Sequence, residues 1–154
     1  MKKYVLLSLA TVTLFSCSTN KKSAYKSVDQ RDVPQRYMKD FQRMRPEVKE
    51  VNWQMADTNT YFANFKTEDN DCIMEFNRTS TATYYVIPKE YVPTDITDYV
   101  NANYQGYSVL DTYICDSQNK KYYITNIKKK SDNKKLQFDL QGNFDRVIET
   151  APQK

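Results

Sequence analysis

The side chains that could carry chemistry in this chain are acidic, thiol and aromatic, because the sequence contains no histidine. The chain therefore lacks the usual zinc ligand, the base of a serine triad and the side chain that exchanges protons near neutral pH. Glu68, Asp69 and Asp71 crowd one predicted turn, without the alternate spacing and closing glutamate of a calcium-binding EF-hand loop. No nucleotide-binding loop or nucleophile elbow is present. We expect a protein that is not an enzyme, with no catalytic residue, metal or cofactor.

The three cysteines have different expected roles. Cys17 follows an apolar run and belongs with the export signal described next. Cys72 and Cys115 have no histidine that could deprotonate them, so a nucleophilic role is not expected. Buried free thiols are the favoured state of this pair, and a disulfide formed in an oxidising compartment is the alternative.

The N-terminus has the three parts of a bacterial export signal. Two lysines precede the apolar run 4–15, which at about 12 residues is shorter than the roughly 20 needed to span a bilayer. The segment 14–17 resembles a lipobox, in which the cysteine is lipidated and becomes the first residue of the mature protein. We therefore expect a lipoprotein signal peptide over residues 1–16 and a lipid on Cys17. A soluble secreted protein is the alternative.

The segment after the signal is polar and shows no apolar periodicity. Residues 17–31 are therefore predicted to form the lipidated cysteine and a flexible tether. Residues 18–22 carry lysines and no acid, which favours an anchor that faces the periplasm over one at the cell surface. The expected location is the periplasm, with membrane contact through the N-terminal lipid. The net charge of +4 is small, so nucleic acid is not an expected partner.

Beyond the tether, the hydrophobic pattern of residues 32–90 occurs again in residues 91–150. Each half begins with a Val-Pro pair followed by helical spacing, over 33–44 and 96–104, and then alternates with a period of two. The sequence predicts an α+β fold of two tandem repeats, each with one helix and a four-stranded antiparallel sheet. Strands are expected at 51–55, 61–66, 72–76 and 83–87 in the first half, and at 110–114, 123–128, 136–140 and 146–150 in the second.

The order of several residues resembles a known family. The matching residues are Val33-Pro34, Phe41, Pro46, Val51, Trp53 and the strand Tyr61-x-Ala63-x-Phe65. This pattern, over residues 32–150, resembles the PepSY-like, beta-lactamase-inhibitor-like periplasmic proteins of Bacteroides and relatives. The resemblance implies a fold similar to the beta-lactamase inhibitor protein, whose combined sheet forms a concave surface. Because related PepSY domains occur in protease propeptides, it also implies a protein partner, with an extracytoplasmic hydrolase as one candidate.

Alternation divides each predicted strand between a face that packs on a helix and an open face. Trp53, Leu110 and Thr112 are expected on the helix side and Val109 on the open side. The open face combines aromatic and branched side chains with amides, as a recognition surface does. The alternative is that these aromatic residues simply suit strands and are covered. The expected partner-binding face consists of Phe62, Asn64, Ile73, Tyr113, Tyr122, Ile124 and Asn126.

Lysine dominates residues 120–135, and Asp132 is the acid among them. These lysines are expected at the tip of a hairpin that turns at residues 131–133. Protection of an exposed sheet edge from aggregation is the favoured role. Contact with anionic lipid headgroups or an acidic partner is the alternative. This basic hairpin consists of Lys128, Lys129, Lys130, Lys134 and Lys135.

These features predict a non-enzymatic, lipid-anchored periplasmic binding protein whose open sheet face holds a protein partner. One alternative is a module that binds a small apolar ligand or lipid in a cavity. Another is a structural lipoprotein of the envelope.

Overall fold

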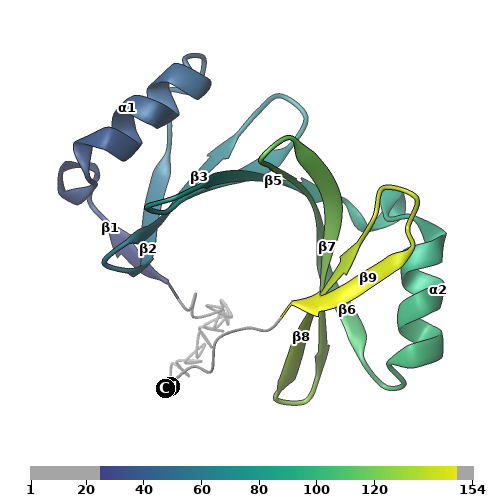
Figure 1. The fold of residues 1–154 in the computed structure, drawn as a ribbon. Helices are drawn as coiled ribbons and strands as arrows, with labels where there is room; N and C mark the ends of the chain where they lie inside the picture. The colour runs from purple at the N-terminus through teal and green to yellow at the C-terminus, as the bar shows by residue number, and fades with distance from the viewer. Residues whose placement is uncertain (1–24, 149–154) are drawn as a thin grey trace, which may run out of the picture.

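The computed structural model describes residues 25–148, in which nine antiparallel strands form one continuous sheet with an α-helix outside each half (Figure 1). The strands follow one another across the sheet in chain order, from β1 at one edge to β9 at the other. The strands are β1 (Lys26–Val28), β2 (Asn52–Asp57), β3 (Thr60–Lys66), β4 (Asp71–Phe76), β5 (Thr81–Ile87), β6 (Ser108–Ser117), β7 (Lys120–Lys129), β8 (Asp132–Phe138) and β9 (Phe144–Ile148). The helices are α1 (Gln35–Met44) and α2 (Thr94–Asn103), each preceded by a short 3-10 helix, η1 (Gln30–Asp32) and η2 (Lys89–Tyr91).

The prediction of two tandem repeats, each with its own four-stranded sheet, is wrong. β5 and β6 pair along their length, with Tyr84 opposite Cys115 and Val86 opposite Tyr113. All nine strands therefore belong to one sheet, and the fold is mostly β with two helices. The spacing of apolar residues locates a strand but does not say which neighbour its edge will hydrogen-bond. The connection through α2 returns the chain beside β5, which the sequence pattern does not reveal.

Part of the predicted flexible tether, residues 17–31, has regular structure, because β1 and most of η1 lie within it. β1 pairs with β2, with Val28 opposite Trp53. Asp29 then caps η1, its carboxylate accepting the backbone N–H of Arg31 at 2.9 Å. Pairing with a free strand edge uses backbone groups, so it requires no apolar pattern that the sequence would display. The predicted signal peptide, residues 1–16, and Cys17 lie outside the described residues.

The first hydrophobic cluster lies between α1 and strands β2 to β5. Helix α1 buries Tyr37 and Phe41, and the Phe41 ring meets Trp53 and Phe65 nearly edge-on, at centroid distances of 5.7 and 5.2 Å. Phe76 completes the aromatic centre at 5.7 Å from Trp53. The predicted helix-side position of Trp53 is confirmed, because the ring is buried in this cluster.

The second hydrophobic cluster lies between α2 and strands β7 and β8. Ile96 and Val100 of α2 pack there with Ile127, Leu136 and Phe138, all five fully buried. Within residues 25–148, no helix is long and apolar enough to cross a membrane.

Irregular strand pairing accompanies the strong curvature of the sheet. The register shifts between β2 and β3, between β6 and β7 and between β8 and β9, and such bulges bend and twist strands. The shift between Val109 and Asp111 reverses the expected sides of two residues, since Val109 packs on the second cluster while Leu110 is 42% exposed. Both helices lie on the outer side of the arch, so the opposite face is concave (Figure 1).

Gly142 should tolerate no side chain at its place in the β8–β9 turn. Its φ is +86°, and an added Cβ would lie 2.9 Å from the Cβ of Asp95 in the first turn of α2. Gly142→Ala is expected to lower the free energy of unfolding by about 1–3 kcal/mol, through left-handed strain and the clash. Gly106→Ala is the matched control, because φ there is +83° but the nearest atom is the flexible Lys129 Cε at 3.2 Å. Equal losses in denaturant unfolding would contradict the clash.

Candidate functional site

A hollow of about 330 Å³ lies on the concave face of the sheet. Cross-strand neighbours form its walls. In the first half of the sheet, Phe62 lies opposite Glu75 and Ile73 opposite Tyr84. In the second half, Tyr113 lies opposite Ile124. Because side chains alternate along a strand, these residues point away from the two helices. The hollow is lined by Tyr25, Gln54, Phe62, Asn64, Ile73, Glu75, Tyr84, Tyr113, Ile124, Asn126 and Lys135.

The structure brings most of the predicted partner-binding face together around this hollow. Phe62, Asn64, Ile73, Tyr113, Ile124 and Asn126 all line it. Tyr122 does not. It pairs with Cys115 in the sheet and lines a separate depression of about 690 Å³ beside β8 and β9.

Two aromatic residues of the hollow are absent from the sequence prediction. Tyr84 lies in the predicted strand 83–87, and alternation from the buried Thr83 would have placed it on the open face. Tyr25 stacks on Phe62 with a centroid separation of 4.5 Å and an interplanar angle of 28°. Because Tyr25 contacts a residue far away in the sequence, no local sequence pattern predicts this contact.

Tyrosine hydroxyls bind the carboxylates of the concave face. Tyr84 donates to Glu75 Oε2 at 2.9 Å, and Tyr113 donates to Asp111 Oδ1 at 3.1 Å. The amide of Asn126 lies 3.4 Å from the same Asp111 oxygen. The Tyr84 and Tyr113 rings meet edge-to-face at 6.3 Å. These contacts orient the aromatic walls and hold both carboxylates in place.

The tyrosines of the hollow keep their protons well above neutral pH. Burial, and then the charge of Glu75, raise the pKa of Tyr84 and of Tyr25. Burial, and then the charge of Asp111, raise the pKa of Tyr113. The hydroxyls therefore act as hydrogen-bond donors on this face, and their carboxylate neighbours remain the acceptors.

The raised pKa of Tyr122 predicts that the protein loses stability at high pH. Burial raises its pKa to about 12 from the ordinary value of 10.0. Because the folded pKa lies above the unfolded one, this contribution to stability is complete below pH 10 and is lost as the pH rises toward 12. Urea unfolding of wild type should show a fall in the free energy of unfolding between about pH 10 and pH 12, and Tyr122→Phe should show a smaller fall. A Tyr91→Phe control, at a largely exposed side chain, should fall as wild type does. Identical losses in all three proteins would contradict the assignment.

The cysteines Cys72 and Cys115 are free and buried, as the favoured interpretation predicted. Cys72 belongs to the first hydrophobic cluster, on the helix side. Cys115 stands in register with Tyr84 and Tyr122, on the concave side. The sheet therefore separates the two thiols, and burial raises the pKa of each.

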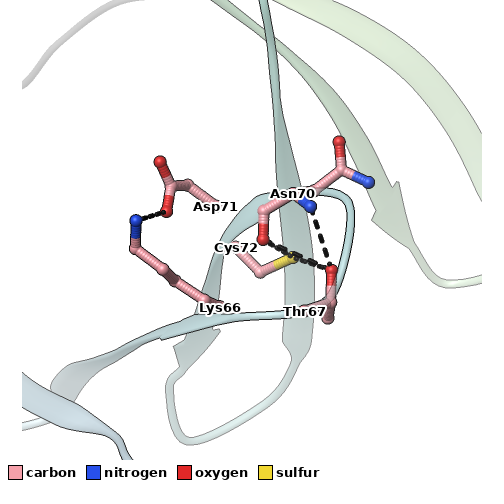
Figure 2. Close-up of polar contacts among 5 residues, drawn as sticks. All are labelled: Lys66, Thr67, Asn70, Asp71 and Cys72. Carbon is pink, nitrogen blue, oxygen red and sulfur yellow. Dashed lines mark hydrogen bonds and ion pairs between the residues drawn. The ribbon is translucent and has the colours of Figure 1, made fainter.

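The acidic residues Glu68, Asp69 and Asp71 lie in and beside the turn between β3 and β4, part of which Figure 2 shows. Asp71 forms an ion pair with Lys66 at 3.2 Å. The turn is closed where the Thr67 backbone N–H donates to the Asn70 carbonyl at 2.9 Å, and the Asn70 N–H donates to Thr67 Oγ1 at 3.2 Å. Within the part of the chain that the structure describes, no group of three acidic, thiol or imidazole side chains could hold a metal ion.

The basic hairpin turns at Lys130–Ser131, slightly before the predicted turn, because Lys129 pairs with Asp132. Its lysines divide between the two faces of the sheet, since Lys129 and Lys134 both lie 5.8 Å from the Tyr107 ring centroid and Lys135 lies on the concave face. Lys129 donates to the Gln105 carbonyl at 3.0 Å, and Lys134 pairs with Asp132 at 3.2 Å, whereas Lys135 lines the hollow. The hairpin therefore offers no single basic patch.

Comparison with known proteins leaves the family open. No protein-family model and no curated protein matches the chain. Among solved structures, the chain is similar to a "putative calcium-regulated periplasmic protein" from Bacteroides thetaiotaomicron, at 20% identity and a TM-score of 0.33, over 81% of this chain and 97% of that one. Similarity at this level establishes neither family nor function, so the PepSY-like resemblance stays a prediction.

Proposed function

We propose that this chain is a non-enzymatic, lipid-anchored binding protein of the periplasm whose concave face holds a protein partner. Inhibition of an extracytoplasmic hydrolase is one form that this role would take. The observation that carries the proposal is the hollow, where aromatic, branched and amide side chains meet on the side of the sheet away from both helices. Such mixed, partly buried surfaces with aromatic anchors carry much of the binding energy in protein interfaces.

A protein side chain suits this hollow better than a small apolar ligand does. Its lining includes the charged Glu75 and Lys135 and the amides of Gln54, Asn64 and Asn126. An apolar ligand would separate from water the donor and acceptor positions of these groups that have no protein partner, at a cost of about 1–3 kcal/mol for each such position. A partner that carries polar atoms would satisfy them.

The proposed anchor would keep the concave face close to the membrane. Tyr25 stacks inside the hollow, and only a short segment separates it from the predicted lipid on Cys17. A fully extended chain advances about 3.3–3.6 Å per residue, so that segment spans at most about 30 Å. The partner would therefore be a protein at or near the same membrane.

Replacing Cys17 tests the anchor. Cys17→Ala is expected to release the protein from the membrane fraction into the soluble periplasmic fraction, because the lipid then has no attachment point. Cell fractionation followed by immunoblotting measures the distribution. Cys72→Ala, a thiol buried in the first cluster, should remain in the membrane fraction. Retention of the Cys17 variant would contradict the lipobox.

Affinity capture tests the binding function. The tagged protein should recover a stoichiometric protein from an envelope extract of its own organism, and Phe62→Ala/Tyr113→Ala should lose it. Uptake of an apolar fluorescent probe, with a raised melting temperature and no captured protein, would instead support the small-ligand alternative.

A further inference from the structure

The hollow has aromatic walls beside a carboxylate. Phe62 and Glu75 stand directly opposite each other on β3 and β4. The Tyr25 ring stacks on Phe62, and the Tyr84 hydroxyl donates to Glu75. The face of an aromatic ring carries negative electrostatic potential, so a ring beside a carboxylate attracts cations.

A second carboxylate adds to this charge from the other half of the sheet. Asp111 is bound by the Tyr113 hydroxyl and the Asn126 amide, two groups that line the hollow. Glu75 and Lys135 are the charged residues of the lining, so Asp111, held just behind it by Tyr113 and Asn126, adds one further negative charge. The directions of the tyrosine pKa values agree, because burial first and carboxylate charge second raise those of Tyr25, Tyr84 and Tyr113.

Glu75 has acceptor capacity left for a ligand. Its Oε2 accepts one hydrogen bond from Tyr84 at 2.9 Å, and its Oε1 has a long contact of 3.5 Å with the amide of Asn77. An ionised carboxylate has about four acceptor positions on its two oxygens. A guanidinium, which donates in a planar fork and stacks on aromatic rings, matches this combination of groups.

We propose that the hollow seats a basic side chain of the partner, an arginine or lysine, with its charged head at Glu75 and its stem against Phe62 and Ile73. This inference rests on the proposed function, since it names the group that the partner inserts. Lys135 then opposes the incoming cation from β8 and limits the affinity.

Methyl NMR of the full chain in mild detergent tests the proposal, with the blocked peptide Ac-Gly-Arg-Gly-NH2 as the probe. The methyl signals of Ile73 and Ile124 should shift saturably, because both residues line the hollow. Those of Ile96 and Ile127 should not move, because these residues are buried in the second cluster. The same peptide with citrulline, a neutral isostere of arginine, should bind at least about tenfold more weakly.

Two substitutions should change this affinity in opposite directions. Glu75→Gln keeps an acceptor for Tyr84 but removes the charge, and it should weaken the arginine peptide about tenfold or more. Lys135→Gln should strengthen it severalfold, by removing the opposing charge. Glu68→Gln, at an exposed carboxylate beyond the hollow, should leave it unchanged.

Equal affinity for the arginine and citrulline peptides, or no saturable shift at Ile73 and Ile124, would overturn the cationic assignment. The proposed function has a separate test, because it fails if the wild type captures no protein or if Phe62→Ala/Tyr113→Ala still captures the partner. A captured partner lost with that double variant but unaffected by Glu75→Gln would leave the function standing and reject the basic side chain.

Discussion

Replacing Trp53 by alanine is expected to lower the free energy of unfolding by about 3–5 kcal/mol. The Trp53 side chain is 2% exposed, with the rings of Phe41 and Phe76 each 5.7 Å away. The substitution would leave a cavity between α1 and the sheet. It would break no hydrogen bond, since Trp53 Nε1 has no hydrogen-bond partner among the described residues, so the loss would report packing alone.

Denaturant unfolding measures this loss. Tyr91→Ala is the control, because the Tyr91 side chain is 74% exposed and its truncation should change the free energy by less than about 0.5 kcal/mol. A loss below about 1 kcal/mol for Trp53→Ala would mean that the packed face of the sheet is not the one beneath α1.

The double substitution Phe62→Ala/Tyr113→Ala is expected to separate binding from folding. Both side chains line the hollow and are only partly buried. Removing two anchors from the centre of an interface should weaken the affinity for the partner by a factor of about 1,000, because each central aromatic anchor contributes about 2 kcal/mol and every 1.4 kcal/mol is tenfold. The free energy of unfolding should fall by less than in Trp53→Ala.

Tyr85→Ala provides the matched control on the other face of the same sheet. Tyr85 packs against the first hydrophobic cluster, and its hydroxyl accepts from Arg45 at 2.6 Å. That variant should lose stability while the molecules that remain folded keep their affinity for the partner. Full capture by the Phe62/Tyr113 variant, or its complete unfolding, would contradict the separate roles of the two faces.

The periodicity of the sequence predicted helix positions and strand faces well where these depend on residues close together in the sequence. The apolar spacing of Tyr37 and Phe41 marked α1, and Pro34 stands at its N-cap as the Val-Pro pair indicated. Strict alternation around Trp53 and Phe65 separated the two faces of β2 and β3. The same alternation placed Phe62, Asn64 and Ile73 beside one another on the concave side.

The periodicity of the sequence could not predict which distant segments pair in the sheet. The β5–β6 ladder, which turns two predicted sheets into one, depends on where α2 returns the chain. Lys26–Val28 is polar at its start, and only the free edge of β2 makes it a strand. The bulge at Leu110 reversed the expected sides of Val109 and Leu110, because one extra residue puts the strand before the bulge out of step with the strand after it.

Photo-crosslinking in living cells shows directly whether the concave face holds a protein partner. A crosslinking amino acid would replace the half-buried Asn64 of the hollow in one variant and the exposed Tyr91 of η2 in another. We expect one crosslinked protein of defined mass from position 64 and none from position 91. Crosslinks of the same pattern from both positions, or none from position 64 in a protein that is folded and correctly localised, would contradict it.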